Sequence, residues 1–184
     1  YKGYKHIPLF SLSGEIAQHC AIMNSPSKTF NVAGFFTAFV IIYNKEVRDK
    51  YLEVYRRFHF DHNFIGAEAL ISAYNECEYY VDEQNAYFYD NIQRVKEFIE
   101  RVMPEVKIIE PEASYLLWLD CRDWGLTSEE LMDLFKSWGV RMNDGSMYGA
   151  SGRGFLRMNI ATQTETLKEA LDRIEKGYSH WKKK

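Results

Sequence analysis

The sequence predicts a mixed α/β fold, and three observations lead to that prediction. The run Phe35–Tyr43 is aromatic and β-branched without alternation, which is typical of a strand covered on both faces. The segment before Pro104 carries apolar residues at helical spacing, which predicts an amphipathic helix: Phe88, Ile92, Val95, Ile99 and Val102. Thr127 and Glu130 have the spacing of a capping box, so a helix is expected to begin there.

Short helices and strands are expected in the first part of the chain. They are a helical turn or two within Ser13–Cys20, a brief strand over Ala21–Met23, the buried strand over Phe35–Tyr43, and helices over Lys45–Phe58 and Phe64–Glu76. Asn44 is the candidate N-cap of the first long helix. One apolar stripe of that helix is expected to face the core: Val47, Tyr51, Val54, Tyr55 and Phe58.

The rest of the chain is expected to form a compact α/β unit. A helix over Val81–Val102 should end before Pro104, and the helix opened by Thr127 should reach Trp138. Strands are expected over Val106–Ile109, Ser114–Asp120, Val140–Met142 and Phe155–Ile160. Thr162 with Glu165 should cap a last helix whose inward residues are Leu167, Ala170, Leu171 and Ile174. The border between the two structural regions is expected at about residues 60–80.

Composition and charge argue against several function classes. With 184 residues, 46% of them apolar, and a net charge of −3, the chain can bury a core and has no bulk attraction to nucleic acid. No apolar run approaches about 18 residues, so no membrane span is expected. Cys20, Cys77 and Cys121 lie far apart without a Cys-x-x-Cys pair, which indicates reduced thiols in a cytoplasmic protein.

Two motifs are assigned no site. His59 and His62 with Asp61 are conceivable metal ligands, but no second cluster lies at ligand spacing, so a polar helix end is the preferred interpretation and no metal is expected. The glycine cluster Gly149–Gly154 lacks the Gly-Lys-Ser/Thr ending of a P-loop. A flexible loop is therefore expected, and the sequence alone does not place the neighbouring Tyr148.

Lys28 is the candidate catalytic residue. It follows Ser27, between the apolar patch Ala21–Met23 and the run Phe35–Tyr43. A desolvated lysine favours the neutral amine, which attacks an aldehyde to form a Schiff base. From spacing alone, an ordinary loop lysine between two strands is the favoured alternative.

The segment Ser25–Gly34 has the order Ser-x-Ser-Lys-Thr-Phe-Asn-x-Ala-Gly. It resembles the cofactor-lysine segment of the pyridoxal 5'-phosphate (PLP) enzymes of aminotransferase class I/II, and more narrowly that of their cystathionine β-lyase, or C-S lyase, branch. Three further segments agree with this family in order and spacing: His6–Pro8, Pro111–Asp120 and Gly154–Ala161. The resemblance therefore covers nearly the whole chain.

The resemblance implies a fold type I PLP-dependent enzyme. Residues 1–60 would be the end of its large PLP-binding domain, and residues 61–184 the interdomain helices and the carboxy-terminal small domain. Such enzymes are much longer, and their amino-terminal half carries the aspartate at the pyridine nitrogen, the aromatic that stacks on the ring and a phosphate-binding helix start. The chain is therefore expected to be a fragment or one piece of a split protein, inactive alone, from an obligate homodimer.

The resemblance also assigns roles to residues of the lysine segment. Lys28 would hold PLP and then act as the base at the α-carbon of an amino-acid substrate. Ser25 would bind the cofactor phosphate, with Ser27 either joining it or only shaping the turn. Asn31 is a site residue or, as is favoured, a turn former. Phe36 stands where many aminotransferases place a phosphate-binding arginine, and this departure mildly favours the C-S lyase branch.

Arg157 is the candidate substrate-binding residue. It lies amid apolar neighbours of an expected strand, where a buried charge needs a partner. Its guanidinium matches a carboxylate with two parallel hydrogen bonds. The sequence leaves a structural pair with Asp120 or Asp144 equally open, whereas the resemblance favours binding of the substrate α-carboxylate.

The function implied is a C-S β-lyase that cleaves cystathionine, cysteine or a related β-thio amino acid by α,β-elimination to a thiol, pyruvate and ammonia. An aminotransferase is the alternative within enzymes, because one lysine can serve both reactions. A non-catalytic remnant or interaction module that kept the small-domain fold is the alternative from another class.

Overall fold

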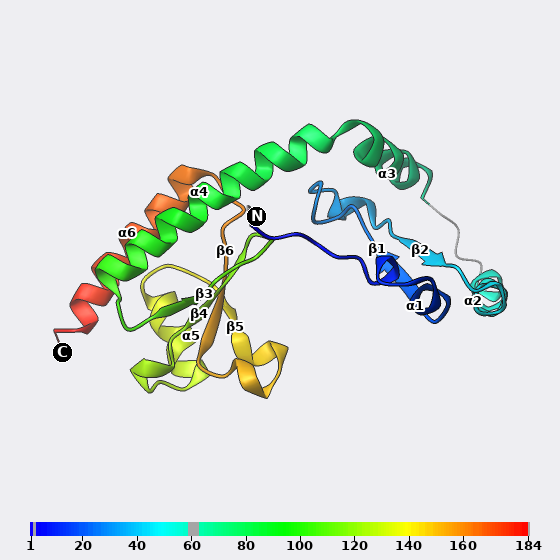
Figure 1. Ribbon diagram of the computed structural model, residues 1–184. Helices are drawn as coiled ribbons and strands as arrows, with labels where there is room; N and C mark the ends of the chain where they lie inside the picture. Colours follow the sequence, from blue (N-terminus) through cyan, green and yellow to red (C-terminus); the bar gives the residue numbers. More distant parts are fainter. Residues whose placement is uncertain (2, 59–62, 184) are drawn as a thin grey trace. The chain divides into compact units, whose positions relative to one another are not determined.

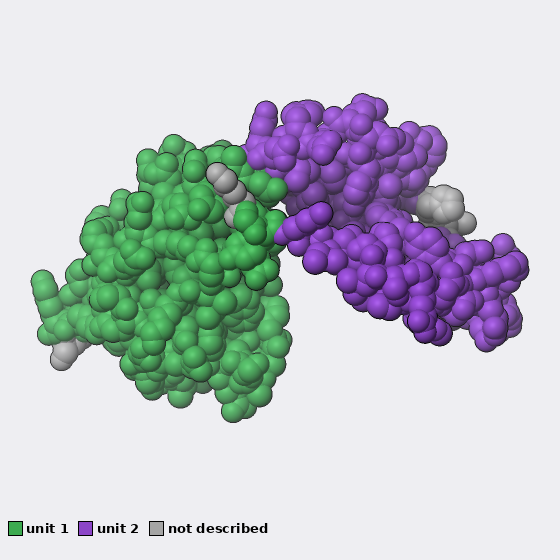
Figure 2. All heavy atoms as spheres, in the orientation of Figure 1, with its two compact units in different colours: residues 1–4, 85–184 green, residues 5–84 purple. Residues whose placement is uncertain are grey.

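The computed structural model describes residues 1, 3–58 and 63–183. The chain divides into two compact units, one formed by Lys5–Gln84 and the other by Tyr1–Tyr4 with Asn85–Lys184, which Figure 2 colours separately. They are called the lysine unit and the arginine unit below, after Lys28 and Arg157. His59, Asp61 and His62, the conceivable metal ligands, lie outside the described residues.

The lysine unit is built around a two-stranded antiparallel sheet (Figure 1). Strand β1 (Ala21–Asn24) pairs with β2 (Phe39–Ile42), with Asn24 opposite Phe39. The short helix α1 (Gly14–Gln18) precedes β1 and is capped by the Ser13 hydroxyl, which accepts the Ile16 amide at 3.1 Å. Two 3-10 helices complete this part, η1 (Leu9–Ser11) and η2 (Ala33–Phe35). The segment between β1 and β2 is thus a closed loop, and Lys28 lies within it.

The predicted long strand over Phe35–Tyr43 is wrong over its first half. Phe35 ends η2, and Phe36 adopts a left-handed backbone with φ of 49° and is 93% exposed, a conformation that cannot continue a strand. Of β2 itself only Ile42 is buried. Burial on both faces is also wrong for this chain, since Phe39, Val40 and Ile41 are only half-buried.

Helix α2 (Lys45–Arg57) begins as predicted at Asn44, whose side chain accepts the amides of Glu46 and Val47. Helix α3 (Phe64–Glu76) is capped by Asn63. The apolar stripe of α2 was expected to face the core, yet no residue of α2 is buried. The helix itself is confirmed, whereas its predicted burial is wrong because no described layer of this unit covers that face.

The arginine unit holds an antiparallel sheet of order β3-β4-β6-β5. Its strands are β3 (Lys107–Ile109), β4 (Leu116–Asp120), β5 (Asn143–Asp144) and β6 (Phe155–Asn159). Three longer helices accompany it, α4 (Glu78–Val102), α5 (Ser128–Ser137) and α6 (Thr164–Trp181), and Figure 1 shows α4 and α6 side by side. The border between the units falls within α4. The short 3-10 helices η3 (Arg122–Trp124), η4 (Gly145–Tyr148) and η5 (Ala150–Gly152) lie in the loops.

One core holds this unit together. Alternate residues of β4 and β6 point into it and are buried, namely Leu117, Leu119, Leu156 and Met158. They join the predicted stripes of the helices, which include Ile92, Val95, Ile99, Leu167 and Ile174. The opposite face of the same strands carries Trp118, Phe155 and Arg157, which are half-buried. Because side chains alternate between the two faces of a strand, one face of this sheet is packed in the core and the other is only half-buried.

The predicted helix starts had different outcomes. The Thr127–Glu130 capping box is confirmed. The cap by Thr162 and Glu165 is wrong, since α6 begins later, after Gln163, without a side-chain cap. The predicted strand over Val140–Met142 is also wrong. The Val140 amide donates a hydrogen bond to the Phe135 carbonyl at the end of α5, and pairing with β6 starts only at Asn143.

Among the described residues, no helix is both long enough and apolar enough to cross a bilayer.

Candidate functional site

Lys28 lies in a turn that two backbone hydrogen bonds define. The Phe30 amide donates to the Pro26 carbonyl at 2.9 Å, and the Val32 amide donates to the Ser27 carbonyl at 3.1 Å. Asn31 has a φ of 54°, which asparagine tolerates better than most residues. This geometry fits the turn-forming interpretation of Asn31.

The two serines of the motif also hold this turn. The Ser25 hydroxyl donates to the Thr37 carbonyl at 2.8 Å and accepts the Ser27 amide at 3.1 Å. The Ser27 hydroxyl lies 2.5 Å from the Ser25 hydroxyl. Because the single hydroxyl proton of Ser25 goes to Thr37, Ser27 is the donor between the two hydroxyl groups. Both side chains are therefore engaged within the loop in this structure.

The Lys28 side chain is exposed, whereas the neighbouring Pro26 is buried. The expected desolvation of the lysine is therefore wrong for this chain, because no described residue of the lysine unit buries the Lys28 side chain. Among the described residues, no carboxylate forms an ion pair with Lys28. A primary amine on an ordered turn, free of an ion pair, fits attachment of an aldehyde such as PLP. The loop supplies only part of a phosphate site, since Phe36 is no cation and the Ser25 proton is already donated.

Residues from the helices fasten the turn, and sequence reasoning missed them. The Gln84 side chain in α4 donates to the Thr29 carbonyl at 2.8 Å. The Tyr74 ring in α3 lies edge-on to Phe30, with ring centres 5.4 Å apart, and to Phe39, at 5.8 Å. These contacts link positions far apart in the chain, so no local pattern indicates them.

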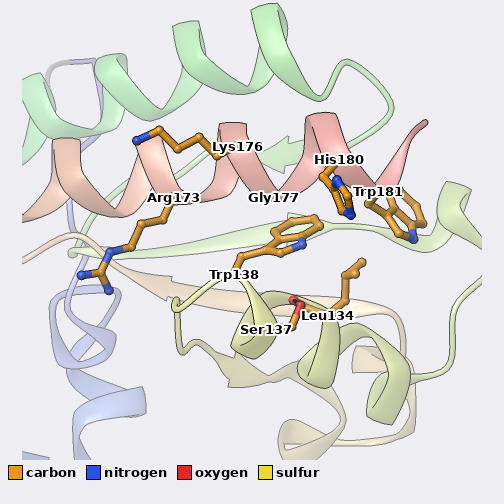
Figure 3. Close-up of a pocket in the computed structure, with 8 residues that line it drawn as sticks. All are labelled: Leu134, Ser137, Trp138, Arg173, Lys176, Gly177, His180 and Trp181. Atoms are coloured by element: carbon orange, nitrogen blue, oxygen red, sulfur yellow. Dashed lines mark hydrogen bonds between the residues drawn. The ribbon is translucent and has the colours of Figure 1, made fainter. Parts of the chain in front are cut away.

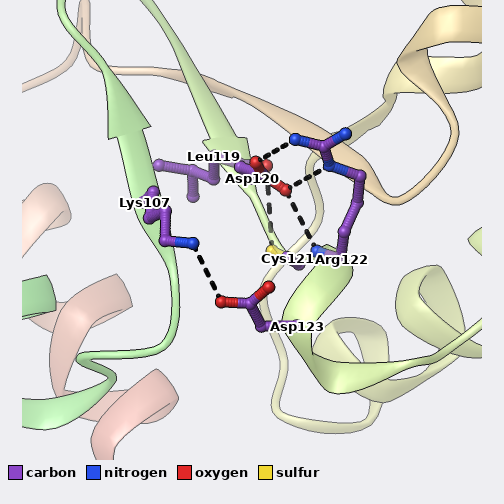
Figure 4. A network of polar contacts seen from close by, with 6 residues as sticks. All are labelled: Lys107, Leu119, Asp120, Cys121, Arg122 and Asp123. Carbon is purple, nitrogen blue, oxygen red and sulfur yellow. Dashed lines mark hydrogen bonds and ion pairs between the residues drawn. The ribbon is translucent and has the colours of Figure 1, made fainter.

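The structural alternative for Arg157 is wrong, because both candidate carboxylates have other partners. Asp120 accepts hydrogen bonds from Arg122 Nε at 2.9 Å and Nη2 at 2.7 Å, and Figure 4 shows this pair beside the Lys107–Asp123 ion pair. Hydrogen bonding from Arg122 lowers the pKa of Asp120. Asp144 accepts both the amide and the hydroxyl of Ser146.

Cys121, beside this network, has no nucleophilic character. Its side chain is buried, and burial raises the pKa of its thiol to about 12. A cysteine acts as a nucleophile through its thiolate. Cys121 is therefore a core residue.

Arg157 lies in β6 on the open face of the sheet, with neutral neighbours. Its Nη2 donates to Asn143 Oδ1 at 3.0 Å, and its Cζ lies 4.4 Å from the centre of the Tyr148 ring. Its Nε is buried and has no hydrogen-bond partner among the described residues. A buried guanidinium nitrogen that lacks both a hydrogen-bond partner and a counter-ion costs free energy. The arrangement suits recognition of a carboxylate.

The structure thus brings Ser25, Ser27 and Lys28 together on one loop of the lysine unit. Arg157 belongs to the arginine unit, and each group is described within its own unit. A separate hollow of about 470 Å³ in the arginine unit lies between α5 and α6, where Trp138 packs against Gly177 (Figure 3). It contains none of the predicted site residues.

Comparisons with known proteins agree with the motif. A sequence model described as aminotransferase class I and II matches residues 2–174. The curated cystathionine beta-lyase PatB of Bacillus subtilis (strain 168) is 34% identical over 179 residues, which cover 96% of this chain and 46% of PatB. An aspartate aminotransferase of Pyrococcus horikoshii is 29% identical over 185 residues, covering 96% of this chain and 45% of that protein.

The fold of the chain also matches that of a solved structure. Cystalysin from Treponema denticola, whose crystal structure contains a pyridoxal 5'-phosphate cofactor, matches with a TM-score of 0.92 and 27% sequence identity, over 97% of this chain and 46% of cystalysin. The chain spans less than half the length of these proteins. The predicted resemblance and the predicted fold, the end of a fold type I enzyme with its small α/β domain, are confirmed. The chain belongs to the aminotransferase class I and II family.

Proposed function

We propose that these residues are the carboxy-terminal part of a PLP-dependent C-S β-lyase. Its substrate would be cystathionine, cysteine or a related β-thio amino acid, and its products a thiol, pyruvate and ammonia. The observation that carries the proposal is the Lys28 amine, held on an ordered turn within a chain that matches the aminotransferase class I and II family. The similarity to a cystathionine β-lyase supports the choice of reaction.

Lys28 has two tasks in this proposal. Its Nζ would hold the cofactor and would take the proton from the substrate α-carbon. PLP, when bound, supplies an electron sink for the charge that this step leaves on the carbon. The pair of serines at positions 25 and 27 lies next to the amine, and turning either hydroxyl outward would offer a donor to the cofactor phosphate.

Arg157 is proposed to bind the substrate α-carboxylate. Its unpaired guanidinium, with Nε lacking a partner among the described residues, supports that role. A planar guanidinium binds a carboxylate in a fixed orientation through parallel hydrogen bonds. Arg157 would thereby fix the orientation of the substrate carboxylate.

The complete enzyme is proposed to be a homodimer with residues beyond this chain. Residues 1–60 would end its large PLP-binding domain, and residues 61–184 would form the interdomain helices and small domain. The rest of the cofactor cradle would come from an amino-terminal half, so the chain alone should be inactive. Three unpaired cysteines, Cys20, Cys77 and Cys121, support a cytoplasmic location.

Reductive trapping tests the proposal. The enzyme that includes the amino-terminal half is incubated with PLP, reduced with borohydride and digested, and the modified peptide is identified by mass spectrometry. The cofactor mass is expected on Lys28. Uniform labelling of surface lysines, or no label at all, would contradict the proposal and favour a non-catalytic remnant. In the enzyme that includes the amino-terminal half, pyruvate release from cystathionine is expected without added keto acid.

An aminotransferase is the second candidate, and the similarity to an aspartate aminotransferase favours it. The same lysine would then return the proton to the cofactor side rather than promote loss of a thiol. Amine transfer that requires a 2-oxo acid, without pyruvate release from cystathionine, would identify this reaction. Phe36, in place of the phosphate-binding arginine of many aminotransferases, supports the lyase.

A further inference from the structure

Arg157 is the centre of a row of side chains that crosses three strands. In the sheet register it pairs with Trp118 of β4 on one side and with Asn143 of β5 on the other. Directly paired residues place their side chains on the same face of a sheet. The row therefore lies on the open face, opposite the buried leucines.

We infer that Asn143 and Tyr148 are positioning residues, which hold the Arg157 guanidinium in one orientation for a carboxylate of the substrate. The inference rests on the proposed function of Arg157 and adds to it the means by which the side chain is fixed. Neither residue was assigned a role from the sequence. Asn143 fixes one end of the guanidinium and Tyr148 fixes its plane.

Asn143 acts through its amide oxygen. Arg157 Nη2 donates to this oxygen at 3.0 Å, and no carboxylate among the described residues pairs with the guanidinium. An amide orients the guanidinium without neutralising it, whereas an aspartate at this position would compete with the ligand. Nη1 makes no hydrogen bond within the described part of the chain, so donors remain for the substrate.

Tyr148 acts through the face of its ring. The Cζ of Arg157 lies 4.4 Å from the ring centre, within the range of a cation–π contact. The Trp118 ring lies edge-on to the Tyr148 ring, with ring centres 5.4 Å apart. The Phe155 ring lies edge-on to Trp118, with ring centres 6.1 Å apart. One face of the guanidinium is thus covered by the Tyr148 ring, which is 47% exposed and packs edge-on against Trp118.

The glycines of the neighbouring loop explain how Tyr148 reaches this place. A Cβ at Gly145 would lie 2.4 Å from the Gly152 carbonyl oxygen, and a Cβ at Gly152 would lie 2.1 Å from the Gly145 carbonyl oxygen. Only glycine permits this close approach of two backbone segments. The contact closes the loop that carries Tyr148 and holds it at the end of η4. The glycine cluster therefore has a structural task beside Arg157.

Fixing the guanidinium in advance lowers the cost of ordering it when a ligand binds. Immobilising one such side chain changes affinity by about two- to tenfold. Loss of either positioning residue should therefore raise KM for the amino acid by about that factor, with kcat little changed, because the reacting atoms are untouched.

The test compares Tyr148→Leu and Asn143→Ala with Tyr148→Phe, which keeps the ring, and with Asn143→Asp, which adds a competing carboxylate. In the enzyme that includes the amino-terminal half, the Leu and Ala variants should raise KM two- to tenfold, the Asp variant more, and the Phe variant not at all. A second readout is the Nε–H signal of Arg157 in the NMR spectrum of the 184-residue chain, identified by its absence in Arg157→Lys. Its hydrogen exchange should accelerate in Tyr148→Leu and Asn143→Ala only.

Unchanged KM and unchanged exchange in the Leu and Ala variants would overturn the inference. A rise in KM accompanied by a comparable fall in kcat and a lower melting temperature would overturn it as well. Should Tyr148→Leu fail to fold, the exposed Asn143 supplies the deciding variants. The outcome is separable from that of the proposed function. Absence of cofactor on Lys28 would defeat the latter, whereas the exchange of the Arg157 Nε–H does not require the cofactor.

Discussion

The Ser25 hydroxyl donates a hydrogen bond to the Thr37 carbonyl at 2.8 Å, across the loop that carries Lys28. Ser25 follows β1 and Thr37 precedes β2, so this bond closes the loop just beyond the last strand pair, Asn24 with Phe39. The lysine is therefore presented by a closed, hydrogen-bonded turn. Its geometry depends on a serine that the motif suggested as a phosphate ligand.

Ser25→Ala should weaken this turn. The Thr37 carbonyl would lose its donor, which costs about 1–2 kcal/mol of unfolding free energy in a partly buried site, and trapping of PLP on Lys28 should slow. Chemical denaturation and the rate of borohydride-trapped labelling measure the two effects. Ser72→Ala, at an exposed position of α3, is the control, and equal behaviour of both variants would contradict the prediction.

Lys28→Ala should abolish attachment of PLP, because no other amine is held on this turn. Mass spectrometry after reduction should find no cofactor on the variant, and lyase turnover in the complete enzyme should be lost. Lys5→Ala removes another exposed lysine of the same unit and should leave the label unchanged. Full turnover in Lys28→Ala would end the proposal.

Arg157→Lys should weaken binding of α-amino acids by roughly ten- to a hundredfold, because an ammonium cannot replace the paired hydrogen bonds of the guanidinium. Attachment of PLP to Lys28 should stay nearly intact. Titration of the complete enzyme with substrate, beside reductive trapping of the cofactor, measures both. A parallel loss of the two would identify Arg157 as a structural residue.

Gly177→Ala should destabilise the arginine unit. The added Cβ would lie 2.2 Å from Cγ of Trp138, and that ring is packed against Phe135 at 4.7 Å. We expect a loss of about 1–3 kcal/mol of unfolding free energy from overpacking. The exposed Ser179 lies in the same helix, and Ser179→Ala should change the free energy little. Similar melting curves for both variants would refute the close packing.

Asp120 should make the stability of the arginine unit depend on acid pH. Hydrogen bonding from Arg122 lowers the pKa of Asp120 in the folded state, so its contribution is complete above the unfolded pKa of about 4 and is lost as pH falls through the folded pKa. Asp120→Asn should cost about 1–2 kcal/mol near neutral pH and flatten the fall in unfolding free energy below pH ~4. Denaturation curves between neutral and acid pH, with Asp133→Asn on the exposed side of α5 as control, measure this. The same acid dependence in Asp120→Asn as in the unaltered chain would contradict it.

Sequence patterns predicted those helices that are stabilised by residues close together in the chain. The Asn44 cap and the Thr127–Glu130 box satisfy amides within the same helix turn, and helical spacing identified the inward residues of α4 and α6. The family was also predictable, because the lysine segment and the Arg157 segment are contiguous motifs. Lys28, Ser25, Ser27 and Arg157 as site residues stay predictions.

The sequence alone therefore determined the helices, the inward stripes of the arginine unit and the family. Only the tertiary structure decided that Phe36 leaves the strand, that Val140 remains with α5, that Asp120 belongs to Arg122, and that Asn143 and Tyr148 lie against Arg157. The physical reason is that a cap or a stripe forms between residues close in the chain, whereas strand pairing and ring packing join distant residues, whose energies appear only when the sheet brings them together.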